Sequence, residues 1–208
     1  KLLNKEGEFM TKDENARMME LLDDSVKSYV DWEKIGKLSH YHEGIENHIN
    51  RILNRSVFDI EAIKKRNFKV LLDCVNGAGS FVMPEFLRKL GCEVIESDCG
   101  KDGIFPRLPE PIPENLTDTI KKIRSNNVDL GIVVDPDVDR LVLITNKGEP
   151  FGEEYTVAQA VRFITQKQEG NVVVNLSTTR AVDDIASENN CQVYRSSVGE
   201  ANVVSKMK

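Results

Sequence analysis

The sequence predicts an α/β fold in which helices pack on a mixed sheet, and two observations favour it. From Phe68 onward, short apolar runs alternate with amphipathic helical patterns in β-α-β-α-β order, and the alternation resumes after a turn at residues 146–149. Glycines and polar turn residues separate the segments. Alternation at this spacing favours parallel strand pairs joined by helices, with ligands at the carboxyl ends of the strands.

The short apolar runs have the length of buried strands. We therefore expect strands over residues 69–73, 93–96, 130–134, 141–145, 172–175 and 192–195. The intervening patterns predict helices over residues 82–90, 114–124, 157–165 and 181–189. Gly91 is placed to end the first of these helices, because glycine readily adopts the left-handed conformation found at helix C-termini.

The first fifty residues carry helical signals. Thr11 and Glu14 have the spacing of a capping box, ahead of a helix that runs to about Asp24. A second helix, ending near Asn54, is predicted by an apolar stripe at Ile45, Ile49, Ile52 and Leu53. Helices of this kind connect or flank domains.

The composition is that of a globular protein of one or two domains, with 208 residues, 40% hydrophobic and 30% charged, and a net charge of −6. No segment approaches the roughly 20 apolar residues of a spanning helix, and the N-terminus lacks the apolar run of a signal peptide. We therefore expect a cytoplasmic protein that does not bind membranes. The acidic balance also argues against a nucleic-acid partner, which requires a basic surface.

Neither the cysteines nor the histidines have the spacing of a zinc site. Cys74, Cys92, Cys99 and Cys191 are isolated and are expected to be free thiols. The three histidines, His40, His42 and His48, lie in one polar stretch that is typical of a solvated surface.

The strongest chemical signal is an acidic loop directly after the apolar run 130–134. It places Asp135, Asp137 and Asp139 within five residues. Unit charges about 4 Å apart repel by about 4 kcal/mol at an effective dielectric constant of 20, so converging carboxylates favour a divalent cation. Oxygen ligands suit Mg²⁺, Mn²⁺ or Ca²⁺. An EF-hand is excluded because Arg140 and Asn146 stand where it needs glycine and glutamate.

Arg140 extends this signal towards phosphate chemistry. A planar guanidinium beside a magnesium-type site can hold phosphate oxygens in a bidentate manner while the metal neutralises others. The alternative, a simple turn with solvated acids, stays open because Asp and Pro are common turn residues.

Two further loops favour structural roles. Asn76–Gly79 lies between a strand and a helix, where it could bind phosphate, but a tight turn that needs positive φ explains it better. Residues 105–111 form a proline-rich loop with one charge of each sign, for which bracing of the structure is the default interpretation.

Two loops near the C-terminus carry polar groups. Arg195, Ser197 and Gly199 supply a guanidinium, a hydroxyl and a flexible backbone, which are the groups of a phosphate-binding turn, although an ordinary loop fits equally well. Residues 177–180 predict a helix N-cap, with a ligand role possible.

These motifs resemble, in order, those of the α-D-phosphohexomutases, the superfamily of phosphoglucomutase/phosphomannomutase and phosphoglucosamine mutase. The resemblance spans residues 66–208. It is carried by Asp73-x-x-Asn76-Gly77-x-Gly79, Phe105-Pro106-x-x-Pro109-Glu110-Pro111, Asp135-x-Asp137-x-Asp139-Arg140 and Val198-Gly199.

The resemblance implies reversible phosphate transfer between the 1- and 6-positions of a hexose, through a sugar 1,6-bisphosphate and a phosphoserine enzyme. It implies that Asp135, Asp137 and Asp139 hold Mg²⁺ and that Arg140 steadies the phosphoryl group. Arg195, Ser197 and Gly199 would bind the phosphate of the substrate. The expected partners are therefore a sugar phosphate and a sugar 1,6-bisphosphate.

The resemblance also implies a repeated phosphoglucomutase-like domain: residues 1–50 as the tail of domain 1, residues 51–149 as domain 2, and residues 150–208 as the start of domain 3. The 208 residues include no Thr-Ala-Ser-His-Asn-Pro-like serine loop and no Gly-Glu-x-Ser-Gly-His-like sugar loop. Together with the lack of an initiating methionine, this predicts a piece of a longer enzyme, inactive by itself. Two positions depart from the family pattern: Ser177 stands where some members carry lysine, and Glu200 follows Gly199. These departures leave the sugar preference open.

Two other functions are weighed against this one. In a haloacid-dehalogenase-like phosphatase, Asp135 would be the nucleophile and Asp137 the acid/base, but that loop usually has Thr or Val in place of Asp139. In a binding or assembly module, the cation would be purely structural.

Overall fold

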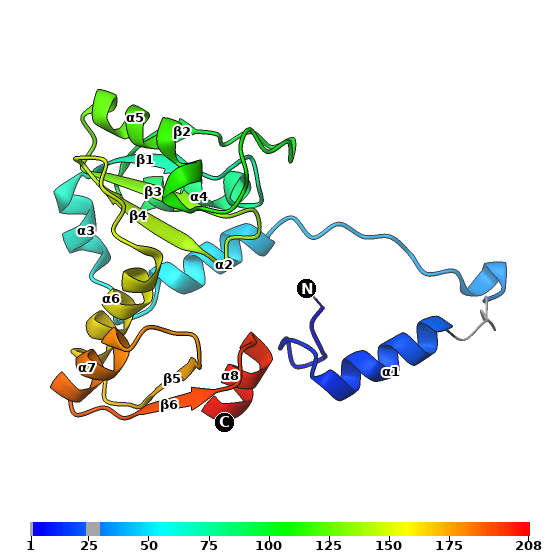
Figure 1. Ribbon diagram of the computed structural model, residues 1–208. Coiled ribbons are helices and arrows are strands. Elements are labelled where there is room, and N and C mark those ends of the chain that lie inside the picture. Colours follow the sequence, from blue (N-terminus) through cyan, green and yellow to red (C-terminus); the bar gives the residue numbers. More distant parts are fainter. Residues whose placement is uncertain (1, 24–29) are drawn as a thin grey trace. The chain divides into compact units, whose positions relative to one another are not determined.

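The computed structural model describes residues 2–23 and 30–208 (Figure 1). The chain divides into two compact units, one comprising residues 43–169 and the other residues up to 42 together with 170–208. The predicted end of the first helix at Asp24 lies outside the described residues. Among the helices that the structure does describe, none is both long enough and apolar enough to cross a membrane.

The unit of residues 43–169 is built on a four-stranded sheet of order β2-β1-β3-β4. Its strands are β1 (Lys69–Asp73), β2 (Glu93–Ser97), β3 (Leu130–Val134) and β4 (Leu141–Thr145). β1 pairs in parallel with both β2 and β3, whereas β4 runs antiparallel to β3. The predicted mixed sheet is therefore confirmed. The carboxyl ends of β1 and β3 lie side by side, with Asp73 paired to Val133.

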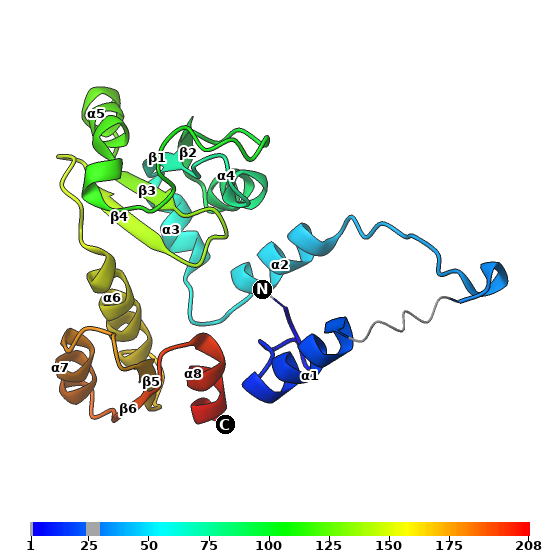
Figure 2. The ribbon, with the colours of Figure 1, turned by 45° about the vertical axis from the view of Figure 1, so that its right-hand side comes forward.

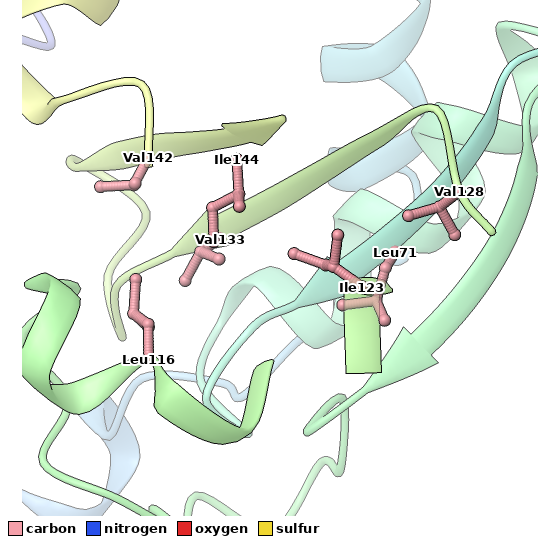
Figure 3. Close-up of a cluster of buried hydrophobic side chains, with 7 residues drawn as sticks. All are labelled: Leu71, Leu116, Ile123, Val128, Val133, Val142 and Ile144. Atoms are coloured by element: carbon pink, nitrogen blue, oxygen red, sulfur yellow. The ribbon is translucent and has the colours of Figure 1, made fainter. Parts of the chain in front are cut away.

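Helices cover both faces of this sheet. Alternate residues of β1 point to opposite faces, as the two-residue period of a strand requires. Leu71 belongs to a core with α5 (Thr117–Asn126), whereas Val70 and Leu72 belong to a second core with α4 (Gly79–Lys89). Figure 3 shows the first core, which comprises Leu71, Leu116, Ile123, Val128, Val133, Val142 and Ile144.

Three more α-helices complete this unit: α2 (Gly44–Leu53), α3 (Ile60–Arg66) and α6 (Glu153–Thr165). Of the apolar stripe predicted on α2, Ile49 is buried, whereas Ile45 is exposed. The short helix α3 was not predicted. It begins at Asp59, whose Oδ1 accepts a hydrogen bond from the amide of Ala62, and ends at Asn67 in the left-handed conformation.

Helix boundaries differ from the sequence prediction at several ends. α4 begins at Gly79, three residues earlier than expected, and ends as predicted just before Gly91, whose φ is 79°. The helix predicted from residue 114 begins instead as a 3₁₀ turn, η2 (Pro113–Asn115), followed by α5. α6 begins four residues before the predicted Val157. Apolar periodicity fails at these ends because the first helical turns are polar or contain glycine.

In the second unit, the predicted capping box of α1 (Lys12–Asp23) is confirmed. The amide of Glu14 donates to Thr11 Oγ1 at 3.3 Å, and the amide of Thr11 donates to Glu14 Oε2 at 2.7 Å. A 3₁₀ turn, η1, spans Trp32–Lys34.

Residues 170–208 form a parallel pair of strands with helices (Figure 2). The elements are β5 (Val172–Asn175), α7 (Ala181–Glu188), β6 (Val193–Ser196) and α8 (Glu200–Met207). β6 lies one residue later than predicted, and α8 was not predicted. Val174, Val182, Ile185 and Ala186 are the buried apolar residues of this segment.

Candidate metal and phosphate site

The acidic loop follows β3 at the carboxyl edge of the sheet, next to the end of β1. It brings Asp135, Asp137 and Asp139 together, with one carboxylate oxygen of each within 4.8 Å of the others. Asp135 is 2% exposed, whereas Asp137 and Asp139 are exposed. Such a group of oxygen ligands could hold a metal ion between one buried carboxylate and two solvent-exposed carboxylates.

Asp135 also organises the loop that follows it. Its Oδ1 accepts hydrogen bonds from the amides of Asp139 at 3.0 Å and Arg140 at 3.1 Å, and its Oδ2 accepts from Arg140 Nε at 3.1 Å. Val138 takes the left-handed conformation, with φ of 64°, to close this turn. These three hydrogen bonds fix the orientation of the carboxylate.

Arg140 lies between two carboxylates. Besides Asp135, its guanidinium contacts Glu110, with Nη1 2.9 Å from Oε1. The hydrogen bond to Asp135 is the main reason that the pKa of Arg140 is raised, and Glu110 adds to the effect. The side chain remains 37% exposed, so a guanidinium held in one orientation still faces solvent beside the acidic cluster.

Glu110 comes from the proline-rich loop, and its contact with Arg140 was missed by sequence reasoning. The same loop carries Arg107, whose Nη2 donates to Asp73 Oδ1 at 3.0 Å. Asp73 is fully buried and also accepts hydrogen bonds from Thr119 Oγ1 at 2.6 Å and from the amide of Val75 at 2.9 Å. The loop therefore braces the structure, as predicted, through two charged side chains: Arg107 binds Asp73 and Glu110 binds Arg140. In the sequence, these two opposite charges within the proline-rich loop were the only indication of the contacts.

The positive φ predicted for the glycine turn, Asn76–Gly79, is found at Asn76 (57°), and Val75, just before the turn, also has a positive φ (47°). Neither Gly77 nor Gly79 has one. Gly77 is required because a Cβ there would lie 2.7 Å from the Cα and the carbonyl oxygen of Pro136, in the acidic loop.

Three amides of the glycine turn have partners within the protein. Those of Asn76, Gly77 and Ala78 donate to Asp98 O, Cys74 O and Pro136 O at 2.6, 2.8 and 2.9 Å. The turn thus supports the acidic loop, and these three amides are not directed at a phosphate.

Arg195, Ser197 and Gly199 lie in the other compact unit, at the end of β6 and the start of α8. The guanidinium of Arg195 donates to the carbonyl oxygens of Thr178 and Asn175, at 2.8 and 3.3 Å, and forms an ion pair with Asp183. Ser197 and Gly199 are exposed, and Gly199 has φ of 116°. Arg195 therefore holds the neighbouring loop, while Ser197 and Gly199 face solvent.

The loop 177–180 supplies a side-chain cap for α7, as predicted: Thr179 Oγ1 accepts a hydrogen bond from the amide of Ala181 at 3.3 Å. Arg180, which directly precedes α7, makes no capping hydrogen bond with its own side chain. Asn175 also organises the loop, since its Oδ1 accepts from the amide and hydroxyl of Ser177 and from the hydroxyl of Thr178.

Comparison with protein-family models gives two matches. Residues 46–148 match the model described as phosphoglucomutase/phosphomannomutase, alpha/beta/alpha domain II. Residues 152–208 match the model of domain III of the same family. The acidic loop and the glycine turn lie within the first match, and Arg195, Ser197 and Gly199 lie within the second.

Curated relatives and solved structures agree with these matches. The chain is 34% identical over 197 residues to a probable phosphoglucosamine mutase of Methanopyrus kandleri, covering 94% of this chain and 42% of that protein. It is 36% identical over 202 residues to a phosphoglucomutase/phosphomannomutase of Thermococcus kodakarensis, covering 96% and 44%. The chain thus spans less than half the length of these relatives.

A crystal structure of a phosphoglucomutase/phosphomannomutase family protein from Burkholderia thailandensis superposes with a TM-score of 0.67. It is 25% identical, and the match covers 78% of this chain and 35% of that one. A putative phosphomannomutase from Thermus thermophilus shares the fold with a TM-score of 0.64 at 24% identity, covering 74% of this chain and 36% of that one. With two consecutive domain models matched and an ordered set of motifs present, the chain belongs to the phosphoglucomutase/phosphomannomutase superfamily of phosphohexomutases.

Proposed function

We propose that this chain is the metal-binding part of a phosphohexomutase that interconverts hexose 1-phosphate and hexose 6-phosphate, the hexose being glucose, mannose or glucosamine. The reaction would pass through a sugar 1,6-bisphosphate and a phosphoserine enzyme in the cytoplasm. The observation that carries the proposal is the convergence of Asp135, Asp137 and Asp139 beside an oriented Arg140 at the carboxyl edge of the sheet. The names of the relatives support the same class of reaction.

Mg²⁺ is the cofactor that we propose for the acidic cluster. The ligand set is made of carboxylate oxygens alone, which suits a hard cation and disfavours zinc or copper. Asp135, Asp137 and Asp139 would hold the ion, which supplies neutralisation of phosphoryl oxygen charge. The hydrogen bonds that Asp135 accepts from its own loop keep this ligand in place before any ion binds.

Arg140 is proposed to bind phosphoryl oxygens. Its Nε and one Nη are occupied by Asp135 and Glu110, so these two carboxylates set the plane of the guanidinium. A guanidinium held in one plane can bind phosphate oxygens at little further cost in conformational entropy.

We propose that the substrate phosphate binds at Arg195, Ser197 and Gly199. We also propose that the chain contains parts of three successive domains, in residues 1–50, 51–149 and 150–208. The contacts of Arg195 indicate that it shapes this loop, while Ser197 and Gly199 are the exposed groups. We further propose that the 208 residues alone catalyse no turnover, because their sequence has no serine loop of the family type.

Titration calorimetry tests the metal assignment. Asp137→Asn should lower Mg²⁺ affinity by at least about tenfold, because even the loss of an outer-shell partner costs roughly 10- to 100-fold at metal sites. The matched control is Asp102→Asn, an exposed acid of the same unit, which should bind Mg²⁺ as the wild type does. Equal affinities for all three proteins would overturn the assignment.

The same method with glucose 1,6-bisphosphate tests the phosphate role of Arg140. Arg140→Ala should weaken binding, whereas Arg55→Ala, at an exposed arginine of the same unit outside both proposed sites, should not. Two results together would favour the binding or assembly module instead. They are unchanged bisphosphate binding by Arg140→Ala and a metal whose sole effect is to raise the melting temperature.

A further inference from the structure

A pocket of about 310 Å³ lies at the amino end of β1, whereas the acidic loop follows the carboxyl end of β3. Its wall comes from α3 and the residues just before it, from Phe68 next to β1, and from the end of α6 and the turn that follows. All these residues belong to the compact unit of residues 43–169. Small-molecule sites in proteins have volumes of about 300–1,000 Å³, so this pocket is large enough for a small ligand.

Most of the pocket wall is apolar. Five of the eight lining residues are Phe58, Ala62, Ile63, Phe68 and Phe163. The rings of Phe58 and Phe163 are stacked, with centroids 6.0 Å apart and planes 14° from parallel. Phe163 remains 38% exposed, so the stack presents ring surface to solvent inside a concave site. An apolar wall with a few polar groups is the usual composition of a ligand pocket.

Two cationic side chains supply the polar groups. Lys167 Nζ lies 4.3 Å from the ring centroid of Phe163 and donates a hydrogen bond to Val57 O at 3.0 Å. Arg66 Cζ lies 5.3 Å from the ring centroid of Phe68. Both distances are within the roughly 6 Å of a cation–π contact. The aromatic rings of the wall therefore hold both cations at the pocket.

No carboxylate neutralises these cations. Among the side chains that the structure describes, none forms an ion pair with Arg66 or Lys167. The acid of the lining is Asp59, whose Oδ1 already accepts a hydrogen bond from the amide of Ala62 at 2.9 Å. The lining thus carries one net positive charge on a chain whose net charge is −6. Charge complementarity therefore favours an anionic ligand here.

We propose that this pocket binds a small aromatic carboxylate. Its rings would pack on the phenylalanine wall, where flat aromatic surfaces stack well, and its carboxylate would face Arg66 and Lys167. The volume suits a body of two fused rings, because a cavity of about 150 Å³ holds one benzene molecule.

The pocket joins the two segments matched by the family models. Arg66 and Phe68 lie within residues 46–148, whereas Phe163 and Lys167 lie within residues 152–208. A ligand that contacts both segments stabilises the packing of α6 beside α3, so it should raise the melting temperature. This site is separate from the acidic loop and does not rest on the proposed metal or on phosphate transfer.

Titration calorimetry with 1-naphthoate and with the neutral 1-naphthalenemethanol tests the charge assignment. The carboxylate should bind saturably and at least about threefold more tightly than the alcohol, because an exposed ion pair contributes up to about 1 kcal/mol. Arg66→Gln and Lys167→Gln should remove that preference while they leave the affinity for the alcohol unchanged. The control is Lys65→Gln, at an exposed lysine of α3 outside the lining, which should keep the preference. No saturable binding, or equal affinities for the two compounds, would overturn the proposal.

A second pair of variants locates the bound rings. Phe163→Ala should weaken the binding of both compounds, because it removes half of the aromatic stack. Phe81→Ala is the matched control, since Phe81 is also half exposed and also carries a lysine, Lys101, over its ring, yet lies outside the pocket. Equal losses for the two variants would place the rings elsewhere and contradict the proposal. The charge variants decide the outcome if Phe163→Ala does not fold.

Sedimentation velocity tests the competing occupant, a second copy of the chain. We expect the sedimentation coefficient to be the same with and without 1-naphthoate. A dimer that dissociates when 1-naphthoate is added would assign the pocket to a contact between copies and would overturn the proposal.

Discussion

The sheet of β1 to β4 and the pair β5–β6 both place polar loops at the ends of parallel strands, yet they hold these loops differently. In the first, Asp73 binds Arg107 and Thr119, which lie 34 and 46 residues away in the sequence. In the second, Asn175 binds groups two or three residues away, and Arg195 binds groups 12 to 20 residues away. Remote segments therefore hold the end of β1 beside the acidic loop, and nearer residues shape the second loop.

The burial of charge explains the difference. Asp73 and Asp135 are almost fully buried, and a buried carboxylate is stable only when paired and hydrogen-bonded. The partners of Asp73 come from remote segments, whereas Asp135 finds its partners in the loop that follows it. In the β5–β6 part the charged groups are partly exposed, so water can complete the hydrogen bonds that the protein leaves unmade.

Asp73→Ala should cause the largest loss of unfolding free energy if the end of β1, beside the acidic loop, depends on remote contacts. It leaves Arg107 without its buried partner, and breaking such a pair costs about 3–5 kcal/mol of unfolding free energy. Urea denaturation measures the loss. The control is Asp118→Ala, an exposed acid on α5, which should leave the midpoint unchanged. A loss below about 1 kcal/mol for Asp73→Ala would be well under the cost of breaking a buried pair. It would show that remote contacts stabilise the first region no more than local contacts stabilise the second.

Gly77→Ala should come next. The added Cβ would meet the backbone of Pro136 at 2.7 Å, and overpacking of this kind costs about 1–3 kcal/mol. We also expect weaker Mg²⁺ binding, because the acidic loop must move. Gly36→Ala is the control, since no atom lies within 4 Å of the added carbon. Unchanged stability and affinity would show that the turn does not support the loop.

Arg195→Ala tests the second region, where we expect a loss of about 1–2 kcal/mol. Hydrogen bonds to charged groups contribute roughly 1.5–3 kcal/mol, reduced here because the side chain is partly exposed. Thermal unfolding compares it with Arg180→Ala, an arginine of the same loop without a capping bond, which should be neutral. A loss as large as that of Asp73→Ala would contradict the comparison.

Glu110→Gln should have the smallest effect on stability, about 0.2–1 kcal/mol, because its ion pair with Arg140 is exposed. A double-mutant cycle with Arg140→Ala isolates the pair. The coupling should fall further in 1 M salt, whereas salt independence would indicate a contact stronger than a surface pair.

Much of the fold was predictable because its signals are local. The six strands found in residues 2–23 and 30–208 were predicted within one residue at each end, since buried strands are continuous apolar runs. α3 and α8, of seven and eight residues, were missed, although α7, also of eight residues, was predicted. Phosphate transfer was expected from Asp135, Asp137, Asp139 and Arg140, which are adjacent in the sequence and therefore visible as one pattern.

By itself the sequence determined the strands, the acidic loop and its position after β3, because each depends on residues a few positions apart. Only the tertiary structure decided that Glu110 reaches Arg140, that Arg107 reaches Asp73, and that Gly77 lies against Pro136. These contacts join segments 30 or more residues apart, and no local pattern encodes them. They form because the parallel order of β1 and β3 brings the ends of distant strands to one edge, where buried charge and close packing select the partners.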